Sequence, residues 1–398
     1  MEKRKVGVGS AVVHNPSRRK VLKQAALAGV GIAASAGRGF SLPASWFAPL
    51  EGVEEVVPFT DIPADFSTRL GDTVFRLDLR QLGSWITPAE DFFSVQHYNR
   101  PEIDASGWEL YITGLVEQPL RFRLDDLRSR PRVERTVTFE CSGNQGIRHH
   151  GMVGNATWAG LSLASLLEAA RPSEDAIEVV FWAADKGKEK IRDNEYEQSF
   201  ARTLSVADAK SSGAILAYEM NGQPLSVRNG FPLRLVVPGW YGIANVKWLE
   251  RIELSDRRLM NRFMGRDYVT IIGRETESGV EWFERSVTRQ RVKSVIARVT
   301  RSGDTFKIFG VAWTDGTPLR SVEVQIDGSS WQTASLEDRK NPYAWTFWTL
   351  ETRGLAPGEH ALVSRATDGK GRAQPESLPL KKTYWEDNAQ FKRTILVS

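Results

Sequence analysis

The stretch Thr136–Asn144, with the sequence TVTFECSGN, contains the only cysteine of the 398-residue chain. Its β-branched and aromatic residues predict a strand, and Ser142, Gly143 and Asn144 are typical of a turn. Cys141 is therefore expected where a strand ends in a loop. A single thiol cannot form an internal disulfide, so it is an inert buried side chain, an intermolecular bridge, a nucleophile or a metal ligand.

The N-terminus has the order of an export signal. Arg18 and Arg19 precede a small-residue apolar run at 25–36, which ends in the small-x-small pattern Ala34-Ser35-Ala36. This order is similar to a twin-arginine signal, which carries folded proteins. Residues 1–36 are therefore expected to be a signal peptide and the protein to be periplasmic. A short basic amphipathic start is the alternative.

The basic balance of the chain comes from this predicted signal. The whole chain has a formal charge of +4, and its first 36 residues hold seven basic residues and one acidic residue, so the remainder is near −2. A nucleic-acid partner therefore has no electrostatic support. The content of 41% hydrophobic and 26% charged residues is ordinary for globular domains with real cores.

The rest of the chain changes texture along its length. Residues 37–74 are rich in proline and acidic residues, which predicts an extended lead-in. Residues 75–285 mix short strand-like runs with short helical patterns, one of them capped by Ser162, so we expect an α+β domain. Residues 286–380 alternate apolar and polar positions between Asp-Gly turns, which predicts an all-β, immunoglobulin-like sandwich. Residues 381–398 are expected to form a tail.

A series of ordered blocks resembles the sulfite oxidase family of molybdopterin enzymes. The blocks are Phe139–Asn144, Gly154–Gly160, Ala217–Leu225, Phe231–Gly239, Asn245–Leu249 and Arg266–Tyr268. The resemblance extends over about residues 75–380. It implies a sulfite-oxidase-type molybdopterin-binding domain followed by an immunoglobulin-like dimerisation domain, a Mo-molybdopterin cofactor with one molybdenum per chain, and a homodimer.

The resemblance also implies roles for individual residues. Cys141 matches the metal ligand, and a thiolate is a soft ligand suited to a redox metal. Tyr268 matches an active-site tyrosine that donates to an oxygen at the metal, and Trp158 matches a wall of the substrate pocket. A pterin with its phosphate needs cations and polar groups from several loops. The matching cofactor-binding residues are Phe93, Ser94, Val95, Gln96, His97, Asp185, Asn229, Arg234, Asn245, Val246 and Lys247.

Structural roles are the alternatives for three of these residues. Arg234 could form a buried ion pair, Tyr268 could be an ordinary interface residue, and His97 could be a core histidine. Asn229 stands where some family members have a histidine.

The arginines that hold sulfite in the family have no counterparts here. Their positions are Val95, Gln145 and the segment after Trp385. Sulfite is a small dianion that needs several guanidinium groups. We therefore expect the substrate to be a less charged oxyanion, S-oxide or N-oxide. A loop with Arg148, His149 and His150 follows the cysteine and could receive it with pH dependence; a solvated loop is the alternative.

The electron partner is expected to be a separate protein. One cysteine cannot make a Cys-x-x-Cys-His haem site, and the lead-in is too short for a b-type haem domain, so no haem is expected in this chain. The resemblance implies a soluble c-type cytochrome or a membrane quinone-linked protein as the external carrier. Two other interpretations stay open. One is a sulfite dehydrogenase whose anion site is rebuilt from Arg148, His149, His150 and Lys392 or Arg393. The other is a non-enzymatic exported binding scaffold.

Overall fold

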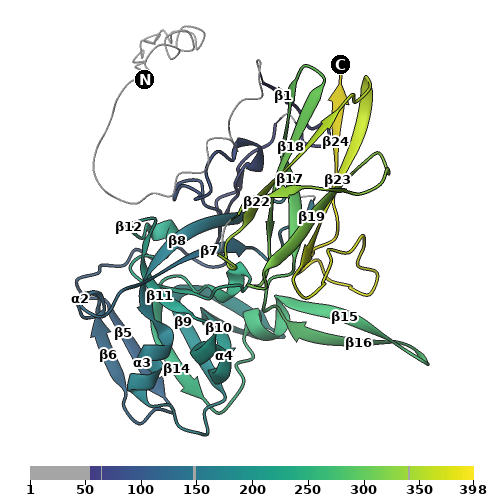
Figure 1. Cartoon of the computed structure of the whole chain (residues 1–398). Coiled ribbons are helices and arrows are strands. Elements are labelled where there is room, and N and C mark those ends of the chain that lie inside the picture. Colours follow the sequence, from purple (N-terminus) through teal and green to yellow (C-terminus); the bar gives the residue numbers. More distant parts are fainter. Residues whose placement is uncertain (1–53, 64, 147–148, 339–340) are drawn as a thin grey trace, which may run out of the picture. The chain divides into compact units, whose positions relative to one another are not determined.

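The computed structural model describes residues 54–398 except 64, 147–148 and 339–340 (Figure 1). The predicted signal peptide lies outside these residues. Within them, no helix has the length and apolar character needed to cross a bilayer.

A five-stranded mixed sheet forms the base of the first domain. In spatial order its strands are β10 (Asn194–Ser205), β9 (Glu178–Ile191), β14 (Leu249–Ser255), β5 (Glu109–Gly114) and β6 (Leu120–Arg123). β14 and β5 run parallel, and the other neighbours are antiparallel. The short helices α2 (Leu124–Arg128), α3 (Leu163–Ala170) and α4 (Val206–Ser211) bury leucines and alanines in the same core as this sheet.

The predicted cap and apolar face of α3 are confirmed. The Ser162 hydroxyl accepts a hydrogen bond from the backbone of Ser165, which satisfies one of the free N–H groups of the first turn. The helix buries Leu163, Leu166, Leu167 and Ala170.

A second sheet carries the cysteine. Its strands are, in spatial order, β12 (Gln223–Pro224), β11 (Ile215–Met220), β8 (Val153–Ser162) and β7 (Val133–Glu140), and β13 (Arg234–Val236) also pairs with β11. β7 ends at Glu140, so Cys141 begins a loop as the sequence predicts. A small sheet of β2 (Arg69–Leu70), β3 (Val74–Phe75) and β4 (Ser94–Val95) lies in the segment that precedes the larger sheets in the sequence.

The C-terminal domain is a two-sheet sandwich, compatible with an immunoglobulin-like domain. One sheet has the order β1 (Glu55–Val57), β17 (Lys293–Ser302), β18 (Thr305–Trp313), β22 (Thr346–Arg353) and β21 (Ser335–Leu336). The other has β20 (Gln332–Thr333), β19 (Leu319–Ile326), β23 (Gly358–Asp368) and β24 (Lys392–Val397). Val322, Val324 and Ile326 alternate inward, as their spacing predicts.

The sandwich differs from its predicted limits at both ends. β1 comes from the stretch expected to be a lead-in and pairs with β17, whereas β24 comes from the expected tail and pairs with β23. These strands have three and six residues, and their partners lie far away in the sequence. Local alternation in such short segments does not reveal a long-range pairing.

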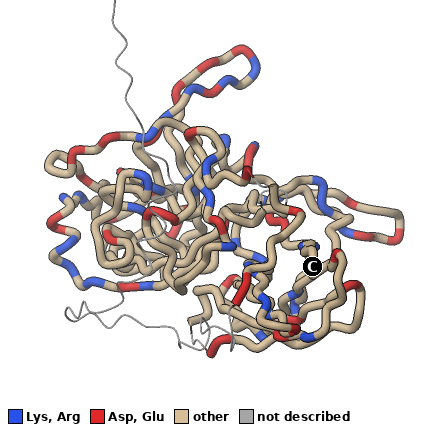
Figure 2. Tube along the Cα trace, turned by 90° about the horizontal axis from the view of Figure 1, so that it is seen from above, with Lys and Arg blue, Asp and Glu red and all other residues tan. Residues whose placement is uncertain are grey.

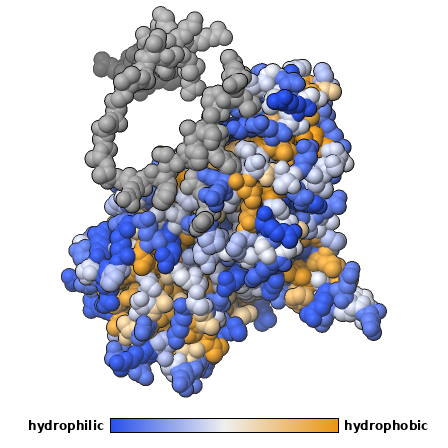
Figure 3. Space-filling model, in the orientation of Figure 1, coloured by the Kyte–Doolittle hydropathy of each residue, from blue (hydrophilic) through white to orange (hydrophobic). Residues whose placement is uncertain are grey.

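The connection between the two domains is a two-stranded arm made of β15 (Val269–Thr276) and β16 (Gly279–Ser286) (Figure 1). The remaining short elements are η1 (Leu79–Gln81), η3 (Val227–Asn229), η4 (Gly242–Ala244) and the π-helical turn η5 (Arg262–Arg266). Strands far outnumber helices in the described residues, so the predicted α+β character is limited to the surroundings of α2, α3 and α4. Acidic and basic residues alternate along the trace (Figure 2), and apolar surface appears as separate patches (Figure 3).

Candidate active site

The loop after β7 presents Cys141 to a cavity. The backbone N–H of Cys141 donates to Met152 O at 2.9 Å, and its carbonyl accepts from the N–H of Asn144 at 2.9 Å. The cysteine is 8% exposed and is one of the residues that line the cavity. A short turn thus fixes the thiol at a wall of the cavity.

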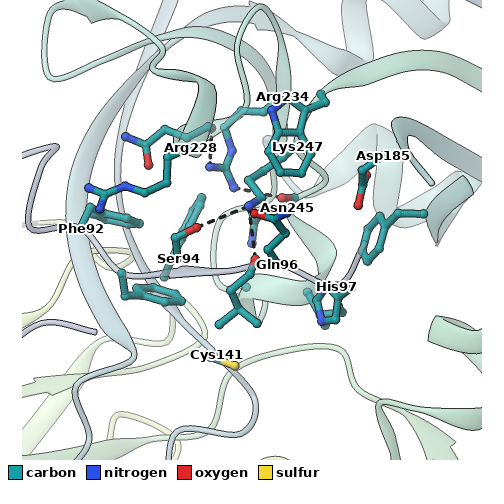
Figure 4. Close-up of a pocket in the computed structure, with 18 of the residues that line it drawn as sticks. Phe92, Ser94, Gln96, His97, Cys141, Asp185, Arg228, Arg234, Asn245 and Lys247 are labelled. Atoms are coloured by element: carbon teal, nitrogen blue, oxygen red, sulfur yellow. Dashed lines mark hydrogen bonds between the residues drawn. The ribbon is translucent and has the colours of Figure 1, made fainter. Parts of the chain in front are cut away.

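Three cations gather on the side of the cavity opposite Cys141 (Figure 4). They are Arg228 from η3, Arg234 from β13 and Lys247 from the loop before β14. Asp185 on β9 is the one carboxylate among the described residues that line the cavity. This end of the cavity therefore suits an anionic group.

Arg234 is fixed by backbone carbonyls and keeps one donor unused. Its guanidinium donates to Asn229 O at 2.8 Å and to Asn245 O at 3.0 Å, and it lies 4.6 Å from the centre of the Trp158 ring. Its Nε is buried without a hydrogen-bond partner. Burial lowers the pKa of Arg234 to about 9. No carboxylate of the described residues forms an ion pair with this arginine, so among them the predicted alternative of a buried ion pair is wrong.

Lys247 lies beside the same end of the cavity. Its amine donates to Val95 O at 3.2 Å and is 3.5 Å from the Ser94 hydroxyl. Burial first, and then the charge of Arg234, lower the pKa of Lys247 to about 7, although Asp185 opposes the shift. Burial likewise raises the pKa of Asp185 to about 7. Both groups change charge near neutral pH.

His97 and Tyr268 also line the cavity, and Lys247 is close enough for its charge to act on His97. His97 Nε2 and the Tyr268 hydroxyl share a short hydrogen bond. Burial, followed by the charge of Lys247, lowers the pKa of His97 to about 3, so this imidazole is neutral at ordinary pH. Burial raises the pKa of Tyr268 well above 10, so its proton stays on the phenol. Phe93, Val95 and Phe139 are further lining residues, and Phe93 and Phe139 belong to the same buried apolar cluster as Cys141.

Most of the residues assigned by the resemblance share this one cavity. Those that line it are Phe93, Ser94, Val95, Gln96, His97, Cys141, Asp185, Asn229, Arg234, Asn245, Lys247 and Tyr268. Val246 does not line the cavity, because its side chain is buried in the core of the first domain. Trp158 is not a pocket wall: it is fully buried and stacks behind Phe139 at 5.0 Å between ring centres.

The histidines after the cysteine also lie away from the cavity, which corrects the predicted substrate loop. The ring of His150 is buried against Phe391, and His149 contacts Phe66 and lines a separate small cavity. A Cβ on Gly146 would come within 2.1 Å of Phe391, so the backbone there lies directly on the sandwich. Arg148 lies outside the described residues.

The described residues predicted to form a sulfite-binding site do not come together at the Cys141 cavity either. Arg393 pairs with Asp61 at 2.6 Å and is 3% exposed, so its charge is already matched. The two histidines lie away from the Cys141 cavity, as described above.

Several cavity residues were not predicted. They are Phe92, Phe139, Phe200, Arg228, Gly242, Ile243 and Trp248. Arg228 precedes the predicted Asn229 and donates to Ala89 O and Glu90 O, a connection 138 or more residues away in the sequence. Its position next to the predicted residue Asn229 in the sequence could have indicated that Arg228 lines the cavity.

Two family models match the chain. The "Oxidoreductase molybdopterin binding domain" matches residues 97–263 and the "Mo-co oxidoreductase dimerisation domain" matches residues 284–395. Human mitochondrial sulfite oxidase (Homo sapiens) is 31% identical over 330 residues, covering 74% of this chain and 58% of the relative. The chain belongs to the sulfite oxidase family. It spans little more than half the length of the mammalian sulfite oxidases that it matches.

Other members of the sulfite oxidase family and a solved structure extend the comparison. Sulfite oxidase of Arabidopsis thaliana is 28% identical over 334 residues, covering 75% of this chain and 84% of the plant protein. A nitrate reductase of Hordeum vulgare is 28% identical over 358 residues, which cover 79% of this chain and 39% of the nitrate reductase. The sulfane dehydrogenase SoxCD from Paracoccus pantotrophus aligns with a TM-score of 0.71 at 24% identity, covering 97% of this chain and all of that chain, which shows a shared fold.

The residues present fit the molybdopterin that this family implies. The Nε of Arg234 has no hydrogen-bond partner and could donate to an anion held by the three cations of the cavity. The thiol of Cys141 lines the same cavity. The described residues contain no group of three or more His, Cys, Asp or Glu side chains that could hold a metal ion. A metal held by one protein thiolate and by the sulfurs of its own cofactor agrees with this arrangement.

We expect Lys247 to make cofactor uptake pH-dependent. Its pKa in the cofactor-free protein is about 7, and a phosphate binds its charged form, so uptake above that pH takes up a proton. Affinity should fall by up to about tenfold per pH unit between about pH 7 and pH 9. Binding of the pterin by cofactor-free protein measures this. The Lys247→Met variant should bind more weakly and show a smaller slope, since Asp185 still becomes charged in this range; an unchanged affinity across this pH range in the wild type would contradict the role.

Proposed function

We propose that this chain is an exported molybdopterin-dependent oxidoreductase that transfers an oxygen atom from water to a sulfur compound less charged than sulfite. The proposal rests on where the positive charges of the cavity lie. Arg228, Arg234 and Lys247 lie on the side of the cavity opposite Cys141, and the thiol belongs to a buried apolar cluster. Among the described residues, a dianion beside the thiol would therefore lose its hydration without gaining an adjacent guanidinium.

The chain's own residues supply binding and orientation. Arg228, Arg234 and Lys247 would hold the cofactor phosphate, and the Cys141 thiolate would be the protein ligand of the metal. When bound, the molybdenum cofactor supplies two-electron oxygen-atom transfer. Per turnover, a sulfur lone pair and one water give a sulfur–oxygen bond, two protons and two electrons, and the electrons leave to an external acceptor.

Tyr268 and His97 would orient the substrate oxygen. When His97 Nε2–H donates to the tyrosine oxygen, the phenol proton is free to donate into the cavity. The high pKa of Tyr268 keeps that proton in place. The buried pair thus offers a fixed neutral donor, which suits an oxygen atom with partial charge.

The substrate proposal is tested by acceptor reduction with a panel of sulfur compounds. The purified enzyme is supplied with sulfite, thiosulfate, a persulfide or a small sulfoxide, with ferricyanide as acceptor. Sulfur compounds are tested first because the sulfite oxidases that the chain resembles act on a sulfur compound, as their name states. We expect a low-charge sulfur compound to give a higher kcat/KM than sulfite. Faster turnover of sulfite would overturn the assignment.

Tyr268→Phe should lower kcat by roughly a hundredfold, because it removes one fixed donor and leaves the ring in place. The Trp385 stack at 4.2 Å should hold the phenyl ring, so molybdenum content should stay constant. Steady-state kinetics with the best substrate measures this. The matched control is Tyr111→Phe on β5, an exposed tyrosine of the other sheet, which should behave as wild type. An unchanged kcat in Tyr268→Phe would refute the role.

Export is proposed on the N-terminal sequence alone. Arg18 and Arg19 precede the small-residue run, as a twin-arginine signal requires. In a bacterial host with this pathway, the R18K/R19K double variant should accumulate in the cytoplasm, where the wild type should be periplasmic. Cell fractionation measures this, and export of the double variant would contradict the proposal.

A further inference from the structure

Three aromatic rings in close contact, one pair stacked and one tilted, lead from the active-site cavity to the surface. Tyr268 lines the cavity and is 5% exposed. Its ring centre lies 4.2 Å from that of Trp385, which lies 4.1 Å from that of Tyr384. Tyr384 is 47% exposed. An unbroken series of π systems therefore joins the buried tyrosine to solvent.

The same two outer rings lie directly on the cysteine loop. A Cβ on Gly143 would lie 3.3 Å from Trp385 and 3.4 Å from Tyr384, so glycine lets both rings approach the backbone two residues after Cys141. The N–H of Glu386 also donates to Ser142 O at 2.8 Å. The cysteine and the outer rings are thus connected by close contact as well as through Tyr268.

Polar contacts fix this segment from both sides. The Lys381 amine donates to Trp385 O at 2.8 Å, and Glu386 forms an ion pair with Arg285 on β16 at 2.9 Å. Glu386 is 3% exposed, so this contact lies inside the protein. The rings are held in position, which electron transfer through them requires.

The surface around Tyr384 is suited to contact with another protein. The arm of β15 and β16 begins directly after Tyr268 and exposes Val280, Trp282 and Phe283. Trp282 and Phe283 are neighbours in a strand, so they face opposite sides of the arm. The amine of Lys382, two residues before Tyr384, lies 3.9 Å from the centre of the Trp282 ring. A two-stranded arm with apolar side chains on both faces gains stability when a partner covers it.

We propose that Trp385 and Tyr384 carry electrons from the active site to a protein acceptor that docks over Tyr384 beside the arm. This inference rests on the proposed function, since it uses the two electrons released per turnover. Each electron passes singly to a one-electron acceptor protein, two acceptors are reduced, and the two protons go to water. A second copy of the chain would explain the exposed arm but not a ring series that ends at the cavity.

The test measures re-oxidation without any substrate. Holoenzyme reduced with dithionite is mixed with oxidised cytochrome c or with ferricyanide in a stopped-flow instrument. Tyr384→Leu should slow re-oxidation by cytochrome c about tenfold, and Trp385→Leu should slow it further. Tyr384→Phe, which keeps the ring, should restore the wild-type rate. Tyr111→Leu, a change at an exposed tyrosine on β5, should have no effect.

A wild-type rate in both Tyr384→Leu and Trp385→Leu overturns the proposal, as does equal slowing in Tyr384→Phe and Tyr384→Leu. If Tyr384→Leu changes only the oligomeric mass measured by sedimentation, the surface is an interface between copies and the proposal is wrong. A preparation that contains no molybdenum contradicts the proposed function instead. Because dithionite supplies the electrons, failure to find a substrate does not affect this experiment.

Discussion

The Cys141→Ser variant should keep its fold and its pterin but lose oxygen transfer by at least about a hundredfold. Serine has nearly the same size, and the backbone bond of residue 141 to Met152 O does not depend on the side chain. The cofactor phosphate is expected to bind at the opposite end of the cavity, on Arg228, Arg234 and Lys247. A hydroxyl is a harder ligand than a thiolate and stays protonated, so the metal should lose its soft ligand.

Three measurements on one sample separate these effects. Pterin fluorescence after release should match the wild type, the thiolate-to-metal absorption should disappear, and substrate-dependent ferricyanide reduction should fall. The opposite control is Arg234→Met, which removes the buried guanidinium and should lose pterin while keeping Cys141. A Cys141→Ser protein with wild-type turnover would show that the thiol does not bind the metal.

The position of the cysteine is a local property that the sequence reveals. Val137, Thr138 and Phe139 form a strand by their β propensity, and Ser142 and Gly143 end it. Arg234 and Lys247 were predicted from the blocks that resemble the family. The side chain of Val246 belongs instead to the buried core of the first domain, which a block match by itself does not encode.

The direction of the loop after the cysteine could not be predicted. It depends on Phe391 and Lys293, which are distant in the sequence and contact Gly146 and Asn144. A cluster such as Arg148-His149-His150 suggests chemistry by composition, but these tertiary contacts turn both histidines away from the cavity. The same holds for β1 and β24, because long-range pairing determines their strand character.

Lys293→Met should be the most destabilising of the substitutions considered. The Lys293 amine on β17 forms an ion pair with Glu140 at 2.9 Å, and both side chains are 1% exposed. It also donates to Asn144 O at 2.6 Å and to Asp387 O at 2.7 Å. Glu140 accepts further from Trp313 at 2.9 Å. Methionine fills a similar volume but leaves a buried carboxylate without its cation, which costs about 3–5 kcal/mol.

Urea unfolding followed by tryptophan fluorescence should measure this loss. The matched control is Arg365→Met, which breaks a pair with Glu323 on the same sandwich at 2.9 Å with side chains 32% and 25% exposed. That change should cost only about 0–1 kcal/mol, because water screens the pair. The double variant Lys293→Met/Glu140→Gln should recover part of the loss, since the unpaired charge is gone.

The buried pair also joins the sandwich to the metal-binding loop, since Glu140 directly precedes Cys141 and Asn144 ends the same turn. Loosening it should therefore expose the thiol as well as weaken the fold. In cofactor-free protein under native conditions, iodoacetamide should alkylate Cys141 faster in Lys293→Met than in Arg365→Met. A loss of stability with unchanged alkylation would mean that Lys293 supports packing between domains without positioning the cysteine. A loss below about 1 kcal/mol would mean that Glu140 is held neutral and needs no cation.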